Sequence, residues 1–389
     1  MSFEKDTTAY AIQLVASAVN SQTAPPKPEN ISWKNVIEFS IKQNVLNIVG
    51  YACETLDRKP DERVMQYLRE FVKHKAVIEA EQEVVCSELM DKLEESGIKY
   101  MPLKGYIIKN LYPRPDMRTM GDIDFLVEEE KIDELISDLT SNDYIFLGHG
   151  DLHSNVKKGR TYIEFHRTLF NKSYRRLTEY FGVGFERAVK NDEKSYRYDL
   201  KNEDMYIFLL AHLAKHYRYA GTGIRTVLDI YVFRKAYPEL DMNYIHTQTA
   251  EIGLLKFQKK IEAIADDWFG GSFNGEFNSI SAYIVSGGVY GSEDMNNVNE
   301  MINSNENIIA GKAKSIFMMV FPPYSLISEL FPVLKKHKLL LPLFWIIRWI
   351  KSLSSDRQNL KNTISTTNKI ISADNFYVKA QRDAEIEEL

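Results

Sequence analysis

The alternation of apolar and polar positions divides the chain into helical stretches on either side of a short region with a different period. Apolar residues recur at intervals of three and four over residues 7–20 and 33–95, and the segment "APPKPENIS" breaks the pattern between them. This spacing is typical of amphipathic helices. Ser32 precedes the second run as a suitable N-cap, and Pro60 interrupts that run before it restarts. Residues 1–95 are therefore predicted to form a helical region.

The pattern changes between residues 96 and 170, where short apolar runs alternate with helical ones. Strands are expected at residues 98–102, 122–128, 144–148, 153–158 and 161–167, and helices at residues 106–112 and 130–142. Strands that alternate with helices and end in adjacent strands indicate a small mixed sheet. We expect the chemistry to lie in this α/β core.

Helical patterns return after residue 171 and are clearest at residues 204–219, 223–237 and 245–268. Residues 270–307 are rich in Gly, Ser and Asn, which predicts loops and short strands. The expected fold class is α+β, with a small mixed-sheet core flanked by N- and C-terminal helical units. The expected regions are an N-terminal helical region (1–95), an α/β core (96–170), a helical region packing on the core (171–290) and a C-terminal helical tail (291–389).

Charge and cysteine content narrow the setting in which the protein acts. The formal net charge is only -5, so no overall field attracts long nucleic acid, and DNA is not expected as a partner. Cys53 and Cys86 are too few and too far apart for a disulfide framework. The N-terminus mixes charges into a helical pattern where a signal peptide would carry an unbroken apolar core. We therefore expect a cytoplasmic protein.

The most apolar segment is "LLLPLFWIIRWI", residues 339–350, which contains Pro342 and Arg348. It falls short of the roughly 20 residues that a membrane-spanning helix needs. Trp345 and Trp349 lie four residues apart beside Arg348, a pattern that suits weak contact between the C-terminal tail and a membrane surface. A helix that packs in the core is the interpretation that we favour.

Candidate chemistry is concentrated in the stretch "MPLKGYIIKNLYPRPDMRTMGDIDFLV", residues 101–127. On a strand, residues two apart share a face, so Asp122 and Asp124 project together while their apolar neighbours face the core. The later segment "YIEFHR" repeats this arrangement with Glu164 and His166. If the two strands are neighbours in register, three carboxylates converge on one sheet face, and a divalent cation or protons must offset their repulsion.

Magnesium is the natural partner for such a set of carboxylates. Mg²⁺ prefers hard oxygen ligands and commonly binds through a few carboxylates together with substrate phosphates. The preceding Lys-Gly pair fits the same chemistry, because Gly105 permits close backbone approach at a helix start, where amide groups can hold phosphate oxygens. Lys104 would add positive charge at that place. Together these features indicate phosphoryl or nucleotidyl transfer.

The stretch "LKGYIIKNLYPRPDMRTMGDIDFLV", followed by "IEFH", resembles the nucleotidyltransferase superfamily. In particular, it resembles bacterial nucleotidyltransferase family proteins with the pattern LKG, YP, R, DIDxLV and a later [ED]xH. The N-terminal helices, "HLAKH", "GIRTVLDI" and the C-terminal tail also look like that family, so the resemblance covers most of the chain.

The resemblance implies a nucleotidyltransferase-like core in which Asp122, Asp124 and Glu164 bind Mg²⁺ and carry out catalysis. Glu164 would accept a proton from an acceptor hydroxyl. The implied reaction is attack on the α-phosphate of an NTP, with ATP among the candidate donors, and release of pyrophosphate. The acceptor is left open among small molecules, glycans, proteins and RNA.

Nucleotide contacts are expected from Lys104, Gly105, Arg118 and His166. Arg118 matches the arginine of the family and would contact phosphate or position the metal-binding strand. The wider superfamily opens the helix with Gly-Ser, whereas Lys104 and Gly105 stand there in this chain, and Tyr106 cannot supply the small hydroxyl of that serine. The nucleotide contact is therefore expected to differ in detail.

Two groups on the later helices are candidates for the acceptor site or for support of the catalytic residues. His212 and His216 of "HLAKH" lie one helical turn apart, but the Glu of a metalloprotease motif is absent, so packing or acceptor-site polarity is favoured over zinc. Asp229 lies in an otherwise apolar helix, where burial would demand a partner such as Arg225, four residues earlier. The resemblance suggests an active-site role for Asp229.

Two alternatives remain open. One is a noncatalytic protein that kept the fold as a scaffold or binding module, acting beside a membrane-linked polysaccharide assembly. The other is an RNA-directed or toxin-like nucleotidyltransferase, in which basic residues between Lys157 and Arg176 would contact phosphate. Steep salt dependence of RNA binding would separate the latter from a small-molecule enzyme.

Overall fold

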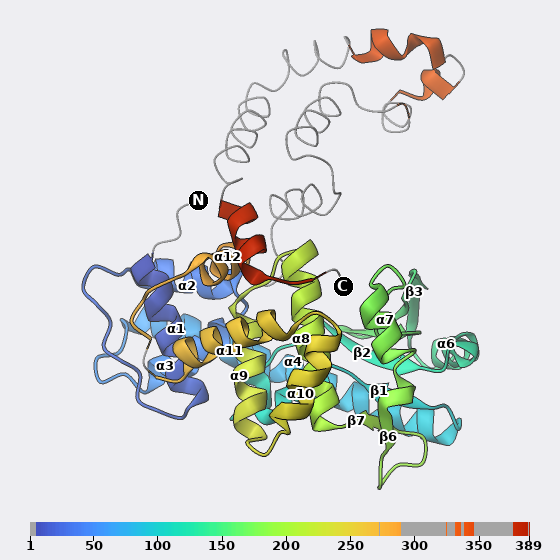
Figure 1. Ribbon diagram of the computed structural model, residues 1–389. Coiled ribbons are helices and arrows are strands. Elements are labelled where there is room, and N and C mark those ends of the chain that lie inside the picture. Colours follow the sequence, from blue (N-terminus) through green and yellow to red (C-terminus); the bar gives the residue numbers. More distant parts are fainter. Residues whose placement is uncertain are drawn as a thin grey trace.

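The computed structural model describes residues 5–271, 273–288, 324, 331–335, 338–345, 376–387 and 389, and in these the chain folds as helices around a mixed sheet. The first helices gather at one end, the sheet lies at the other, and the helices of residues 202–269 lie between them (Figure 1). This is the predicted α+β class, with a small sheet flanked by helices from both sides of the sequence.

The N-terminal region is helical, as its apolar spacing predicts. Its helices are α1 (Lys5–Val19), α2 (Trp33–Lys42), α3 (Leu46–Glu54) and α4 (Glu62–Glu95). Ser32 caps α2, because its side chain accepts a hydrogen bond from the backbone N–H of Lys34. Asp61 caps α4 in the same way through the N–H of Val64. The break at Pro60 therefore separates two helices.

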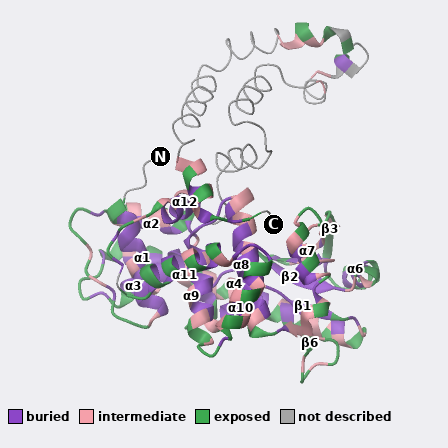
Figure 2. Ribbon diagram, viewed as in Figure 1, coloured by how far each residue is buried: buried purple, intermediate pink, exposed green. Residues whose placement is uncertain are grey.

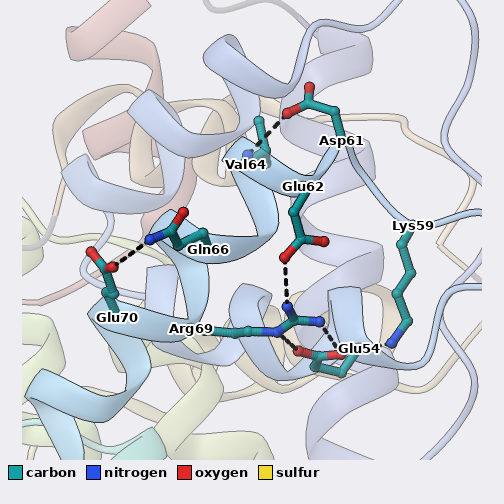
Figure 3. Close-up of polar contacts among 8 residues, drawn as sticks. All are labelled: Glu54, Lys59, Asp61, Glu62, Val64, Gln66, Arg69 and Glu70. Atoms are coloured by element: carbon teal, nitrogen blue, oxygen red, sulfur yellow. Dashed lines mark hydrogen bonds and ion pairs between the residues drawn. The ribbon is translucent and has the colours of Figure 1, made fainter.

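Charged side chains connect the end of α3 to the start of α4 (Figure 3). Glu54 accepts a hydrogen bond from Nε of Arg69 at 2.6 Å and one from Lys59 at 2.7 Å. The hydrogen bonds from Arg69 and then Lys59 lower the pKa of Glu54 to about 2. All three side chains are substantially exposed, and exposed ion pairs contribute at most about 1 kcal/mol. The position of α4 is thus set mainly by packing.

The sheet is five-stranded with the order β1-β2-β5-β4-β3. Its strands are β1 (Tyr100–Pro102), β2 (Asp122–Val127), β3 (Ile145–His149), β4 (His153–Lys158) and β5 (Thr161–His166). The pair β2 and β5 is parallel, and the other pairs are antiparallel. Between β1 and β2 the chain forms α5 (Gly105–Ile108) and the 3-10 turns η1 (Lys109–Leu111) and η2 (Pro115–Met117). Between β2 and β3 it forms η3 (Glu129–Lys131) and α6 (Ile132–Thr140).

One face of the sheet is covered by α4 and α6. Apolar residues of both helices pack with Ile123 and Phe125 of β2 and with Ile163 and Phe165 of β5, all of them buried. Because side chains alternate along a strand, the residues between these project from the opposite face. The sheet therefore has one closed apolar face and one face available for polar side chains.

Lys109 anchors the short helical turn after β1 to α4. Its side chain is only 1% exposed and its ammonium group contacts Glu79 at 2.8 Å and Glu83 at 2.5 Å. The hydroxyl of Tyr106 also donates to Glu83. Tyr106 therefore contacts α4.

The later part of the chain is largely helical, with elements that the sequence did not predict. Its elements are α7 (Arg175–Phe181), η4 (Phe185–Arg187), β6 (Ala188–Lys190), β7 (Tyr198–Leu200), α8 (Asn202–Tyr219), α9 (Ile224–Ala236), α10 (Met242–Glu251), α11 (Leu255–Phe269), α12 (Ser279–Gly287), η5 (Pro332–Lys335) and η6 (Lys338–Leu340). The hairpin of β6 and β7 was missed. The expectation of loops and short strands over residues 270–307 was wrong at α12, where Asn278 supplies an N-cap and an apolar run follows.

A single large core joins the N-terminal helices to α7–α12. Figure 2 shows buried residues running through α1, α8 and α9 and into the sheet. The two helical regions predicted from sequence thus share one hydrophobic core, and the four-region division stays a prediction. Most of the predicted C-terminal tail, including residues 346–375, lies outside the described residues. Among those that are described, no helix is both long and apolar enough to cross a membrane.

Candidate active site

The acidic residues of β2 and β5 meet on the sheet face opposite α4 and α6. In the parallel pairing Asp124 lies directly beside Glu164, and Asp122 lies beside Tyr162. The alternation along each strand places Asp122, Asp124 and Glu164 on the same side. The predicted convergence of three carboxylates is confirmed as geometry.

Asp124 is buried, and its carboxylate contacts the side chains of Lys104 and His166. Its Oδ1 accepts from Nζ of Lys104 at 2.9 Å and lies 2.7 Å from Nε2 of His166. Burial by itself would raise the pKa of Asp124, but the charge of Lys104 and the hydrogen bond from His166 outweigh it and hold that pKa well below its ordinary value. Asp124 is therefore a carboxylate throughout the physiological pH range.

Asp122 and Glu164 respond in opposite ways to the same surroundings. Asp122 begins β2 at an exposed position, yet desolvation of its carboxyl group raises its pKa, and the charges of Asp124 and Glu164 add to this rise. In Glu164 a hydrogen bond from His166 outweighs desolvation and lowers the pKa. Repulsion between neighbouring carboxylates is thus partly unrelieved at Asp122, as expected of a site that gains from a bound cation.

Two histidines flank Glu164 on this face. His166 follows Glu164 on β5, with its Nε2 3.3 Å from Oε2 of Glu164. His153 on β4 pairs directly with His166 in the antiparallel register, and its Nε2 lies 3.5 Å from Oε1 of Glu164. The hydrogen bonds to Asp124 and Glu164 raise the pKa of His166 despite desolvation, whereas desolvation lowers that of His153. Among the described residues, these three form a group whose ligand atoms lie within 4.8 Å of one another.

Lys104 holds its position at a backbone cost. Its φ of 44° with ψ of -114° is a conformation that L residues other than glycine rarely adopt. Strained backbone of this kind is often found at functional sites. Lys104 is the N-cap residue of the one-turn helix α5, and its side chain forms the ion pair with Asp124.

Gly105 has a packing reason to be glycine. A Cβ at this position would lie 3.0 Å from Cγ of Met120 and 3.3 Å from Nη1 of Arg118. Gly105 was expected to allow a phosphate to approach the backbone closely. In the structure the side chains of Met120 and Arg118 approach it closely. Its role in nucleotide binding stays a prediction.

Arg118 is buried in an ion pair with α9. Its Nε donates to Oδ1 of Asp229 at 2.8 Å, and the hydroxyl of Tyr112 donates to the same oxygen at 2.8 Å. Burial of Asp229 was expected to demand a partner such as Arg225, and the structure shows Arg118, 111 residues away in the sequence, as an ion-pair partner. The charge of Asp124 also acts on Arg118. Of its two predicted roles, positioning of the metal-binding strand suits this geometry better than a phosphate contact.

Helix α8 brings a further group of residues to the site. Nε2 of His212 and Nε2 of His216 lie 3.2 Å apart. Desolvation and the charge of Lys104 lower the pKa of His212 well below its ordinary value, and desolvation with the charge of Lys215 lowers that of His216 to about 3. Both are therefore neutral, and one donates to the other.

Lys215 is a residue that the sequence analysis missed. It is half-buried on the α8 face of His212 and His216, and no hydrogen bond or ion pair joins it to another described residue. Desolvation, followed by the charge of Lys104, lowers its pKa to about 8, and the charges of Asp124 and Glu164 act in the opposite direction. A lysine between two histidines in "HLAKH" was the available signal, but its placement depends on how α8 packs.

The basic residues proposed to contact RNA are mostly neutralised by acidic neighbours. Ion pairs of this kind join Lys158 to Glu88, Arg160 to Glu81, Arg175 to Glu179 and Arg176 to Glu387. Lys157 differs, since it lies on the carboxylate face opposite Tyr162 in the β4–β5 pairing. A continuous basic track for a polyanion is therefore not formed by this part of the described chain.

Comparison with known sequences agrees with the arrangement of these residues. The sequence model of a family described as uncharacterised nucleotidyltransferase matches residues 29–270, a range that includes all five strands of the sheet and helices α2 to α11. A search of curated proteins finds no match. Because the match covers more than half of the chain, the protein belongs to this uncharacterised nucleotidyltransferase family.

Proposed function

We propose that the protein is a Mg²⁺-dependent enzyme that transfers a nucleoside monophosphate from an NTP to a hydroxyl group of an acceptor. The observation that carries this proposal is the parallel pairing of Asp124 with Glu164, which brings Asp122 into the same group. Family membership supports the transferase class. The dependence on Mg²⁺, the use of an NTP as donor and the hydroxyl-bearing acceptor are all parts of this proposal.

The donor set suits a hard divalent cation. Asp124 is held deprotonated, and Asp122 carries a raised pKa that a cation would relieve. Asp122, Asp124 and Glu164 would hold the ion. When bound, Mg²⁺ would offset the negative charge that develops around the α-phosphate.

The residues of the chain itself can position the phosphates. Lys104 and Lys215 are two ammonium groups whose charges act on each other beside the carboxylates, and an anion between them would stabilise both. Arg118, fixed by Asp229, would hold the start of β2 in place. We assign Lys104 and Lys215 to the triphosphate and Arg118 to positioning.

Glu164 would act as the proton acceptor. Its lowered pKa keeps it ionised near neutral pH, it pairs directly with Asp124, and its charge acts on Asp122. In the proposed step the acceptor oxygen forms a bond to the α-phosphorus and its proton moves to Glu164. The bond from the α-phosphorus to the oxygen that bridges it to the β-phosphate breaks, and pyrophosphate leaves.

A small acceptor is favoured over RNA. Four of the basic residues that would contact RNA phosphates are paired with glutamates. Binding to polyanions depends on releasing counterions from phosphates that basic side chains neutralise, and paired side chains contribute little to this.

Label transfer tests the proposal. The protein is incubated with Mg²⁺, each of the four NTPs labelled at the α-phosphate, and cell extract separated into small-molecule, RNA and protein fractions. We expect label to move from one NTP into the small-molecule fraction with equal release of pyrophosphate, and Asp122→Asn to abolish the transfer. Failure of all four labelled NTPs to transfer label to any fraction would contradict the proposal.

A further inference from the structure

We propose that His153, Glu164 and His166 bind a divalent first-row transition-metal ion, so that the protein prefers such an ion over Mg²⁺ at this position. This site shares Glu164 with the carboxylate group and adds two imidazoles to it. Its existence does not depend on the transfer reaction, and only its use in that reaction rests on the proposed function.

The three side chains come together because of the register of two strands. His153 on β4 is the direct antiparallel partner of His166 on β5. Glu164 lies two residues before His166 and therefore projects from the same face. Strand pairing, which is more rigid than a loop, fixes all three side chains.

The two distances from the histidines to Glu164 are those of ligands around one ion, and all the ligand atoms lie within 4.8 Å of one another, so small side-chain rotations would bring them onto the ion. Nε2 of His153 lies 3.5 Å from one carboxylate oxygen of Glu164, and Nε2 of His166 lies 3.3 Å from the other. Two ligands each about 2.1 Å from a tetrahedral ion are separated by about 3.4 Å. The side chains of His153, Glu164 and His166 are 29%, 20% and 10% exposed, so an ion can reach them.

The ligand types select the kind of ion. Mg²⁺ favours oxygen ligands, whereas imidazole nitrogen suits ions such as Zn²⁺, Fe²⁺ and Co²⁺. Two histidines and one carboxylate leave positions open for water or for a phosphate oxygen. A set made only of carboxylates would show a weaker preference, because imidazole nitrogen adds affinity for a transition-metal ion and little for Mg²⁺.

Metal binding would change the contacts of Asp124. Nε2 of His166 now lies 2.7 Å from Oδ1 of Asp124, and this nitrogen must lose its proton and turn to the ion. Lys104 remains on the same oxygen of Asp124 at 2.9 Å, so that carboxylate keeps a cationic partner. The two positions can therefore be filled side by side.

The competing interpretation is that both histidines only orient the carboxylates by hydrogen bonds. The two interpretations differ in metal preference. If His153 is a ligand, its loss lowers the affinity for a transition metal and leaves that for Mg²⁺ nearly unchanged. If His153 only orients Glu164, both affinities fall together.

Co²⁺ binding to the full-length protein without nucleotide tests the site. Visible absorption reports the ligands of Co²⁺, and calorimetry gives its affinity beside that of Mg²⁺. The variants are His153→Gln and a matched control, His149→Gln. His149 belongs to the neighbouring strand β3, and its Nδ1 lies 2.8 Å from Oγ of Ser154.

We expect the wild type and His149→Gln to bind one Co²⁺ more tightly than Mg²⁺, with an absorption spectrum typical of imidazole ligands. His153→Gln should weaken Co²⁺ binding by at least about 10-fold and change the spectrum, since loss of a group that only supports a ligand already costs about 10- to 100-fold. Equal affinities for Co²⁺ and Mg²⁺ in the wild type, or an unchanged Co²⁺ affinity in His153→Gln, would overturn the inference. Metal-dependent nucleotide binding that survives such a result would leave the proposed transferase intact.

Discussion

The buried pair of Arg118 and Asp229 gives the sharpest prediction about stability. The side chains are 10% and 7% exposed, and Nε of Arg118 contacts both oxygens of Asp229 at 2.8 and 3.1 Å. Asp229→Asn keeps the size of the side chain and removes its charge, which leaves the Arg118 guanidinium buried without its ion-pair partner and with only the more distant charge of Asp124. Breaking a buried ion pair in this way costs about 3–5 kcal/mol. That is a large share of the roughly 5–15 kcal/mol by which folded proteins are stable.

The chain supplies a matched control for this experiment. Arg234 contacts both oxygens of Asp266 at 3.0 and 3.1 Å, but the two side chains are 30% and 55% exposed. Asp266→Asn should cost less than about 1 kcal/mol, because water screens that pair. The geometry is similar in the two pairs and the burial differs.

Urea unfolding followed by intrinsic fluorescence measures both variants, with the slope against urea concentration checked for constancy. A loss of about 3–5 kcal/mol for Asp229→Asn against less than about 1 kcal/mol for Asp266→Asn is expected. Equal losses would show that burial of the Arg118–Asp229 pair does not set the cost of breaking it. The double variant Arg118→Met with Asp229→Leu should recover part of the loss, since no buried charge remains.

The remaining predictions concern the two lysines near the carboxylates. Affinity for an NTP, measured by calorimetry with Mg²⁺ present, should fall as pH rises through about 8, because Lys215 is protonated and cationic below its pKa and neutral above it. Lys215→Arg should remove this fall, and a wild-type affinity that stays level up to pH 9.5 would contradict the assignment. At Lys104, the glycine variant should be more stable than the alanine variant by about 1 kcal/mol in urea unfolding, because both lose the amine but only glycine relieves the positive φ. Equal stability of the two variants would show that the backbone carries no strain there.

Local periodicity was enough to predict the carboxylate face. Asp122 and Asp124 are separated by one apolar residue on a strand, so their common direction follows from the period of two. The same rule gave Glu164 and His166. The sequence did not establish that the two strands are neighbours. The structure shows that they are, because β2 and β5 pair in parallel.

Contacts between distant segments could not be predicted in the same way. Arg225 was suggested as an example of a partner for Asp229 because a residue four positions away is one that helical spacing offers. The partner in the structure comes from the loop before β2, and no local pattern identifies it. The position of Lys215 similarly depends on the large core that packs α8 beside the sheet.

Composition was misleading at α12. Gly, Ser and Asn are turn residues on average, so residues 270–307 were expected to lack helix. Asn278 is used as an N-cap, and the run "ISAYIV" that follows is buried. A capping residue before an apolar run is a stronger local signal than the composition of the surrounding segment.

Nucleotide titration shows whether the carboxylates of β2 bind a nucleotide together with a metal ion. Calorimetry with ATP, GTP, CTP and UTP, each with and without Mg²⁺, is performed on the wild type, Asp124→Asn and Asp122→Asn. Thermal unfolding confirms that each variant is folded, and Asp122 at the exposed start of β2 is the substitution least expected to disturb the core. We predict Mg²⁺-dependent binding of one nucleotide by the wild type and its loss in both variants. Binding that needs no metal and persists in both variants, or no binding of any nucleotide with Mg²⁺ present, would contradict the account.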